Sequence, residues 1–544
     1  MKLHAMIPMR DGVRLAANVF LPAEHLRVPV ILERTPYGKG ADITPNYQAF
    51  VDHGYAVVVE DVRGRYESEG AFQPLEQEPA DGDDTLNWIA RQPWSDGKIG
   101  MIGGSYRGIV QWKAALRNNP HLKAIFPVVS GNDDYRDRFY STGGAMKLGN
   151  RLEWMSENLR APGYHPDFAK FVLHLPLRTS DIAATGWTSE MYRVAVAHPA
   201  FDAYWRGIST REQLSKIRIP VFAVGGWYDN FVESDLDAFG ALHKTSGLNR
   251  ILIGPWPHNM SYKFADTDFG PDSAVPMRSL QLEWFDQWLM GKDTPLVSEP
   301  PVKIFVMGSN RWREEREWPP QEATAREYYL LGNGHANSLN GDGTLGGRPA
   351  RRGAVDHFVF DPRDPVPTRG GAVCCNPSVF PWGPMDQRPV ERRPDVLVYT
   401  TGGLREDVEV IGPVQVVLWV ATSARDTDFT AKLVDVFPDG YARNLTDGIL
   451  RLRYRDSLEK PEPAKEGEIY RITVDAGVTS NVFRKGHRIR LEISSSNFPR
   501  FDRNPNAGGV IADETHLWKA TQTVYHDRQH PSHLVLMVMP GGKG

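Results

Sequence analysis

Apolar runs alternate with helical patterns along the first 130 residues of the chain. Continuous apolar runs are typical of strands covered on both faces, as in a parallel sheet with helices on either side. Helical patterns separate these runs, and residues 1–27 alternate as edge hairpin strands do. This order of elements predicts a doubly wound α/β domain. The predicted buried strands are 28–32, 56–60, 99–102 and 124–129.

The alternation stops at about residue 132 and resumes after residue 216. Residues 132–216 lack strand-like apolar runs and contain helical patches and many prolines. An insertion of this size beside the carboxyl edge of a sheet is typically a cap over a site, although a separate helical domain is an alternative. We therefore expect an α/β catalytic domain formed by residues 1–131 and 217–298, with 132–216 as a helical cap insertion.

From residue 299 to residue 544 the pattern changes to short alternating strands. Glycine, proline, asparagine and aspartate separate these strands, and the first of them covers residues 303–307. Many short strands at such spacing are typical of a sandwich or jelly roll. The second half of the chain is therefore predicted to be an all-β jelly-roll domain, residues 299–544.

Composition narrows the possible partners. The 544-residue chain is too long for one hydrophobic core. It is 41% hydrophobic and 24% charged with a formal net charge of −4, which gives no basic footprint for nucleic acid or an anionic membrane. Without a membrane-length apolar stretch or a signal-like start, we expect a cytoplasmic protein, and homo-oligomerisation is left open.

The chain has two cysteines, and they are adjacent at Cys374 and Cys375. One adjacent pair cannot form the disulfide framework of a small secreted domain. The pair could be redox-active or could bind a metal. The prediction is instead two buried small side chains.

Residues 98–108, K-I-G-M-I-G-G-S-Y-R-G, join a predicted strand to a predicted helix through a glycine turn with Ser105 at its tip. Strand, tight turn, serine and helix form the geometry of a nucleophile elbow. The turn exposes the serine hydroxyl, and the first N–H groups of the helix point toward developing negative charge. Gly-Gly-Ser also occurs in ordinary turns, so the serine needs partners before it indicates chemistry.

Two titratable residues follow later strands, in the order that a hydrolase triad requires. Asp229 follows the strand predicted at 219–224, and His258 follows the strand predicted at 250–253. In α/β-hydrolases the order along the chain is serine, acid and histidine, each beyond a strand. Ser105 is therefore the predicted nucleophile, His258 the base and Asp229 its orienting acid, with the backbone N–H of Tyr106 as an oxyanion donor.

Several motifs together resemble the cocaine-esterase and X-Pro dipeptidyl-peptidase family of serine hydrolases. They are Gly103–Gly108 around the serine, Asp61–Gly70, Gly225–Asp229, Gly254–His258 and Ser494–Asn504. The resemblance implies an α/β-hydrolase core, an inserted helical cap and a C-terminal jelly roll with a galactose-binding-like fold. It also implies that a tyrosine hydroxyl, here Tyr37, is the second oxyanion donor, and that no cofactor or metal takes part.

The expected substrate is a small carboxylic ester with an apolar acyl group. The resemblance extends to α-amino-acid ester hydrolases, which hold the substrate ammonium with extra carboxylates, two of them shortly after the catalytic aspartate. Phe231 and Val232 occupy those positions here, and apolar side chains cannot neutralise an ammonium group. X-Pro dipeptidyl-peptidase or amide cleavage remains an alternative, with Glu233, Asp133 or Asp134 as the amine anchor. A non-catalytic carbohydrate-binding protein is a less favoured alternative. The residues predicted to line the pocket are Trp187, Trp227, Tyr228, Phe231 and Trp256.

Overall fold

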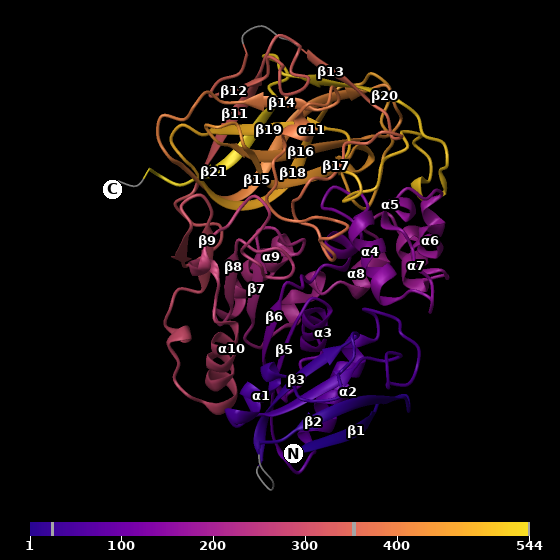
Figure 1. Ribbon diagram of the computed structural model, residues 1–544, viewed down its shortest axis with the longest axis vertical. Helices are drawn as coiled ribbons and strands as arrows, with labels where there is room; N and C mark the ends of the chain where they lie inside the picture. Colours follow the sequence, from indigo (N-terminus) through magenta and orange to yellow (C-terminus); the bar gives the residue numbers. More distant parts are fainter. Residues whose placement is uncertain (23–26, 351–354, 542–544) are drawn as a thin grey trace.

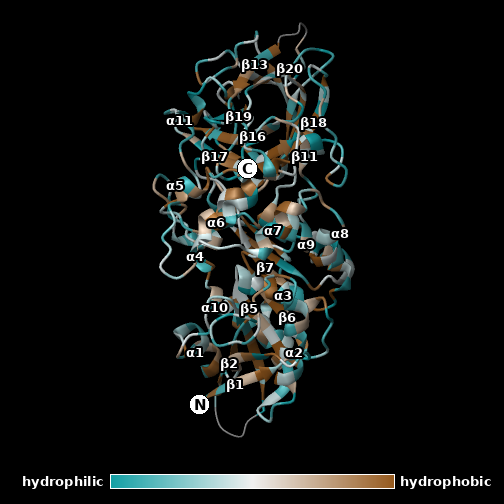
Figure 2. Ribbon diagram, turned by 90° about the vertical axis from the view of Figure 1, so that its right-hand side faces the viewer, coloured by the Kyte–Doolittle hydropathy of each residue, from teal (hydrophilic) through white to brown (hydrophobic). Residues whose placement is uncertain are grey.

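The computed structural model describes residues 1–22, 27–350 and 355–541 of the chain. Figure 1 shows one sheet near the N-terminus, a second β-rich body at the opposite end, and a group of helices beside the junction. Hydrophobic residues gather along the strands of both sheets (Figure 2). The N-terminal half is α/β-hydrolase-like and the C-terminal half is β-rich, which confirms the predicted fold class at that level.

The first sheet has ten strands in the order β1-β2-β4-β3-β5-β6-β7-β8-β9-β10. Neighbours from β4 across to β9 are parallel, whereas β1, β2 and β10 pair antiparallel with their neighbours. The strands are β1 (Lys2–Pro8), β2 (Arg14–Phe20), β3 (Val28–Thr35), β4 (Ala56–Asp61), β5 (Ser95–Gly104), β6 (Leu122–Val128), β7 (Phe222–Gly226), β8 (Arg250–Gly254), β9 (Val302–Val306) and β10 (Arg311–Glu315).

Helices cover both faces of this sheet, which explains the continuous apolar runs. Successive residues of β3 point to opposite cores: Leu32 packs with α2 and α3, whereas Ile31 packs with α1 and α10. The helices around the sheet are α1 (Pro45–Asp52), α2 (Glu78–Ala90), α3 (Tyr106–Ala115), α9 (Val232–Ser246) and α10 (Met277–Phe285).

The domain boundary at residue 299 remains a prediction, but the first strand placed beyond it belongs to the first sheet. The strand expected to open that domain is β9, and it pairs in parallel with β8 of the first sheet. β10 then pairs with β9, so the first sheet continues to residue 315. An alternating V-K-I-F-V run specifies a strand but not its partner, so the pattern could not assign β9 to a sheet.

The inserted segment between β6 and β7 is helical, as expected. Its helices lie beside the junction of the two sheets (Figure 1). Among them α4 contributes most to the site described below. The helices are α4 (Leu148–Asn158), α5 (Phe168–Phe171), α6 (Ser180–Thr185), α7 (Glu190–Ala197) and α8 (Ala203–Ile208).

The second sheet has eleven strands, with β18 paired on β15 beside a path of ten. Some of its strands alternate as predicted: in β21 every second residue is buried, so one face packs inward. The jelly-roll topology remains a prediction. The elements are β11 (Thr324–Leu331), β12 (Thr344–Gly346), β13 (Val355–Phe360), α11 (Arg388–Glu391), β14 (Leu397–Thr400), β15 (Val408–Thr422), β16 (Asp428–Val436), β17 (Ala442–Arg451), β18 (Tyr470–Phe483), β19 (Arg488–Ser494), β20 (Ala520–Tyr525) and β21 (His533–Val538).

In the described part of the chain, none of the helices has both the length and the apolar character that a membrane crossing needs. The cytoplasmic location remains a prediction.

Candidate active site

Ser105 lies on a sharp turn between β5 and α3. Its backbone has φ 59° and ψ −128°, a left-handed conformation that non-glycine residues rarely adopt and that is typical of nucleophile elbows. A Cβ at Gly103 would lie 2.5 Å from the Cβ of Arg107, so the turn requires glycine there. A Cβ at Gly108 would lie 2.5 Å from the Cβ of Ser130, which explains the later glycine of the motif.

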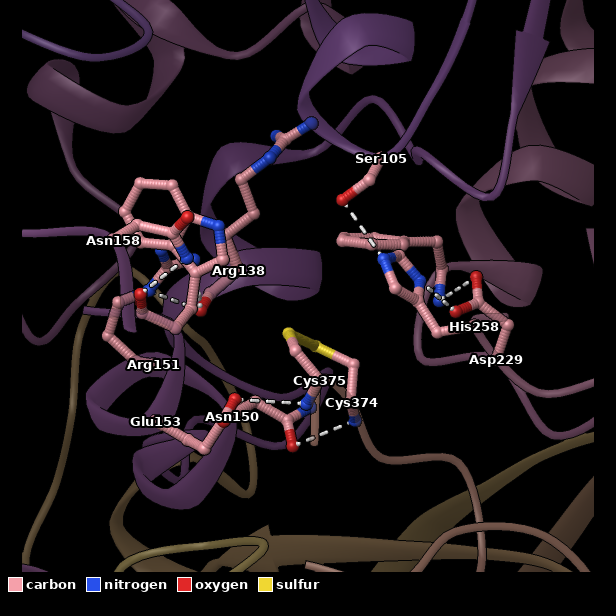
Figure 3. The surroundings of a disulfide bond; sticks show 12 residues. Ser105, Arg138, Asn150, Arg151, Glu153, Asn158, Asp229, His258, Cys374 and Cys375 are labelled. Carbon is pink, nitrogen blue, oxygen red and sulfur yellow. Dashed lines mark hydrogen bonds and ion pairs between the residues drawn. A yellow bond between two sulfur atoms is a disulfide. The ribbon is translucent and has the colours of Figure 1, made fainter. Parts of the chain in front are cut away.

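The structure brings Ser105, His258 and Asp229 together at the carboxyl edge of the sheet. β7 and β8 are adjacent parallel strands, so the loops that follow them open at the same edge. His258 Nε2 lies 2.9 Å from Ser105 Oγ, and His258 Nδ1 lies 2.8 Å from Asp229 Oδ1 (Figure 3). Asp229 is fully buried, and its other oxygen accepts the N–H of Phe231 at 3.3 Å. This places a proton on Nδ1 and leaves Nε2 free to accept the serine proton.

Two groups are suitably placed to hold negative charge beside Ser105. Among the described residues, no hydrogen bond occupies the backbone N–H of Tyr106, the first residue of α3. Tyr37 follows β3 and lines the same pocket as Ser105. The indole N–H of Trp154 donates to Tyr37 Oη at 3.1 Å, so the phenol proton remains free to point toward the pocket. Sequence reasoning missed Trp154, since its helical pattern gives no sign of this contact.

Two contacts of the Tyr106 side chain stabilise the turn. Its hydroxyl donates to Glu78 at 2.8 Å, and its ring stacks on Trp154 with centroids 6.3 Å apart. Glu78 in turn pairs with buried Arg34 at 2.8 Å. Burial and the neighbouring Glu78 raise the pKa of Tyr106 well above its usual value, so this phenol stays neutral.

The pocket at Ser105, here called the catalytic pocket, differs from the one predicted. Five aromatic residues were expected to line it, and Phe231 is the one of these five that does. Three of the others are buried at the junction with the second half of the chain or beneath the sheet edge, where each donates one hydrogen bond to a carbonyl. These bonds join Trp227 to Phe305 at 2.7 Å, Tyr228 to Asn444 at 3.0 Å and Trp256 to Ser273 at 3.1 Å.

Trp187 lies outside the catalytic pocket and is 49% exposed. It lines a neighbouring surface groove that shares Pro74, Leu75 and Met191 with the pocket. Trp227, Tyr228 and Trp256 lie within two residues of Asp229 or His258, but side chains next to such a residue differ in direction, and only some of them face the pocket.

Charged residues of the pocket come from the inserted segment. They are Asp137, Arg138 and Arg151. Arg138 forms an ion pair with Asp134, and Arg151 donates to the carbonyl of Arg138 at 3.0 Å. Burial and then the nearby Arg138 lower the pKa of Arg151 to about 10, which still leaves it charged at neutral pH.

The proposed amine anchors lie away from the catalytic pocket. Asp134 pairs with Lys113 and Arg138, and Asp133 pairs with Arg136 at 2.6 Å. Glu233 lines a separate polar chamber, which also contains Asp137, Lys147, Arg211, Asp475 and Arg500. Asp137 and Asn230 line both hollows, so the two adjoin.

The two cysteines were predicted to be buried small side chains; Cys374 is buried and Cys375 is half-buried, but the two form a disulfide. Both residues line the catalytic pocket, across from Ser105 (Figure 3). A redox-active pair was one of the alternatives that the two adjacent cysteines left open. Nothing in the sequence indicates that the loop around residue 374 reaches the catalytic domain.

Comparisons with known proteins agree with this architecture. Residues 11–260 match the X-Pro dipeptidyl-peptidase (S15 family) model, and residues 296–535 match the X-Pro dipeptidyl-peptidase C-terminal non-catalytic domain. A cocaine esterase of a Rhodococcus species is 40% identical, with 98% of each chain covered.

Two solved structures resemble the fold over its whole length. An aminopeptidase from a marine sediment archaeon of the Thaumarchaeota has a TM-score of 0.88 at 26% identity, covering 99% of this chain and 96% of the other. An α-amino acid ester hydrolase has a TM-score of 0.87 at 28% identity, with the same coverage.

Fold and site together define a hydrolase with an α/β-hydrolase-like domain and a β-rich companion. The chain belongs to the cocaine-esterase and X-Pro dipeptidyl-peptidase (S15) family of serine hydrolases.

Proposed function

We propose that this chain is a serine esterase that cleaves carboxylic esters through an acyl-serine intermediate. The observation that carries the proposal is the continuous chain of hydrogen bonds from Ser105 through His258 to Asp229, at 2.9 and 2.8 Å. The relation to a cocaine esterase at 40% identity supports an ester as substrate.

The reaction follows from the positions of these side chains. Ser105 Oγ attacks the acyl carbon while His258 Nε2 accepts its proton. The tetrahedral oxyanion accepts hydrogen bonds from the Tyr106 N–H and the Tyr37 hydroxyl. His258 then donates its proton to the leaving alkoxide, and Asp229 stabilises the imidazolium throughout. Water, activated by His258, attacks the acyl-serine and releases the acid.

Charge in the catalytic pocket favours an uncharged ester over a substrate with a free amine. Arg138 and Arg151 give two cations against one carboxyl, Asp137. One oxygen of that carboxyl is already engaged, because Oδ2 accepts the N–H of Asn132 at 3.0 Å and the hydroxyl of Ser234 at 2.6 Å. An ammonium group would therefore lose its water and meet two cations beside one partly engaged carboxyl.

X-Pro dipeptidyl-peptidase activity is the second candidate, since the two matching family models bear that name. A panel of p-nitrophenyl esters measured beside an X-Pro anilide separates the two. We expect the esters to have the larger kcat/KM. Faster cleavage of the anilide would reverse the order of the two candidates.

A fluorophosphonate probe tests the nucleophile. Wild type should be labelled, whereas Ser105→Ala should be unlabelled and at least about 10³-fold slower on the best ester. Ser298→Ala, at an exposed serine that bonds the Pro295 carbonyl, is the matched control and should be labelled like wild type. An unlabelled wild type would refute the proposal.

A further inference from the structure

The Cys374–Cys375 disulfide lies in the catalytic pocket but takes no part in the proposed chemistry. These are the only two cysteines of the chain, and both line the pocket that contains Ser105. Figure 3 shows the disulfide facing the space between Ser105 and the side chains of Arg138 and Arg151. It belongs to the loop between β13 and α11, so the second half of the chain supplies part of the pocket wall.

Three successive residues hold this loop on one side of α4. The N–H of Cys374 donates to Asn150 Oδ1 at 3.3 Å, and the N–H of Cys375 donates to Glu153 Oε2 at 3.1 Å. The side-chain amide of Asn376 donates to Glu157 Oε1 at 2.8 Å. Residues 150, 153 and 157 lie on one face of the helix, so the loop is held along two turns. The pocket wall is therefore a positioned surface.

The same helix positions the predicted oxyanion donor. Trp154, one residue beyond Glu153, donates its indole N–H to Tyr37. The disulfide and Tyr37 are thus held by neighbouring residues of α4, on two sides of the space that an acyl group would occupy. A change in the shape of the disulfide wall would alter which acyl groups fit beside Ser105.

We propose that the Cys374–Cys375 pair determines the acyl specificity of the pocket, and that its oxidation state changes that specificity. The inference rests on the proposed esterase function. A disulfide keeps its two sulfur atoms in one compact group. Reduction breaks the S–S bond, adds two electrons and two protons, and leaves two thiols that must separate to van der Waals contact. Because Cys374 is buried and Cys375 is half-buried, the proposal assigns the movement into the pocket to the Cys375 sulfur.

This movement sets an order of pocket sizes. The dithiol form has the smallest acyl space, the disulfide form has more, and a chain without either sulfur has the most. Because one methylene in an apolar pocket changes relative rates by about tenfold or more, selectivity between a large and a small acyl group should follow the same order.

The experiment measures kcat/KM for p-nitrophenyl benzoate divided by that for p-nitrophenyl acetate. Wild type is prepared as the disulfide with diamide, which takes two hydrogens from two thiols. It is prepared as the dithiol with dithiothreitol, which becomes its cyclic disulfide and supplies two electrons and two protons. Titration with a thiol reagent should give no thiols in the first state and two in the second.

We expect the benzoate-to-acetate ratio to fall about threefold to tenfold on reduction. It should rise about tenfold in the Cys374→Ala/Cys375→Ala double variant, which should not respond to either reagent. An unchanged ratio in wild type, with the thiol counts verified, would overturn the proposal even if the double variant failed to fold. Absence of fluorophosphonate labelling and of hydrolysis in both states would instead refute the esterase function.

Discussion

The two hollows that adjoin at Asp137 and Asn230 differ in the residues that line them. The catalytic pocket is lined largely by aromatic and aliphatic side chains and by the disulfide. The polar chamber is lined largely by charged side chains from α9, the inserted segment and the second half of the chain. Arg211 and Asp237 pair there at 2.7 Å, and Arg500 pairs with Asp447.

The two hollows therefore differ in role. The catalytic pocket is suited to the reaction, and the polar chamber pairs charges at the junction between the domains. An apolar pocket strengthens each hydrogen bond to a developing oxyanion, because little water competes for it. In the polar chamber the charges largely neutralise one another, and they join three parts of the chain. Changes in the pocket should therefore alter rates, whereas changes in the chamber should alter stability and its dependence on pH.

The largest effect is expected for Tyr37→Phe. The substitution removes one oxyanion donor and preserves the ring, so kcat should fall by about 10²–10³-fold with little change in Tm. Burst kinetics with p-nitrophenyl esters measure the acylation step. Tyr47→Phe is the matched control, since this tyrosine bonds Glu33 at 2.6 Å outside the pocket and its loss should leave kcat within about threefold. A Tyr37→Phe enzyme as fast as wild type would remove Tyr37 from the oxyanion hole.

A smaller effect is expected for Trp154→Phe, because Trp154 acts through Tyr37. The variant loses the 3.1 Å hydrogen bond and retains an aromatic ring to stack on Tyr106. We expect kcat/KM to fall about threefold to tenfold, as expected for one neutral hydrogen bond. A double-mutant cycle identifies the route: in the Tyr37→Phe background the same substitution should cost nothing further. An equal loss in both backgrounds would reduce Trp154 to a packing role.

The candidate site shows which residues can be predicted from the sequence. Ser105, Asp229 and His258 were predictable because each lies within four residues of the end of a buried strand, and parallel strands bring such loops to one edge. The antiparallel N-terminal hairpin and the covered strands were predictable for a similar reason, since local periodicity determines which faces are buried.

Trp154 and the disulfide could not be predicted, because neither the order of the strands nor a local motif indicates which distant segment they contact. Trp154 meets Tyr37, and Cys375 meets Glu153, only after the inserted helices and the second half of the chain have docked. Helical periodicity shows that α4 is a helix but not which element lies against each face. The assignment of β9 failed for the same reason, because a strand pattern does not identify its partner.

Changes in the polar chamber should alter stability and leave activity constant, unlike changes in the catalytic pocket. Burial and then the neighbouring Asp475 raise the pKa of Glu233 to about 8, while Lys147 and Arg500 partly oppose the shift and Asp137 adds to it. Between the ordinary glutamate value near 4.3 and about 8, the folded chain keeps a proton that the unfolded chain has released. The unfolded state binds fewer protons in this window, so stability falls as pH rises through it, by at most about 1.4 kcal/mol per pH unit.

Glu233→Gln removes this titration and should reduce the loss of Tm between pH 5 and pH 8, while kcat on a p-nitrophenyl ester stays within about twofold of wild type. Glu466→Gln is the matched control, because it makes the same change at an exposed glutamate outside the chamber. Its Tm should follow the wild-type pH profile. If Glu233→Gln lost Tm with pH as wild type does, the carboxyl would not hold a proton in the chamber. If it lost activity instead, the chamber and the catalytic pocket would not be separable, and the contrast between them would fail.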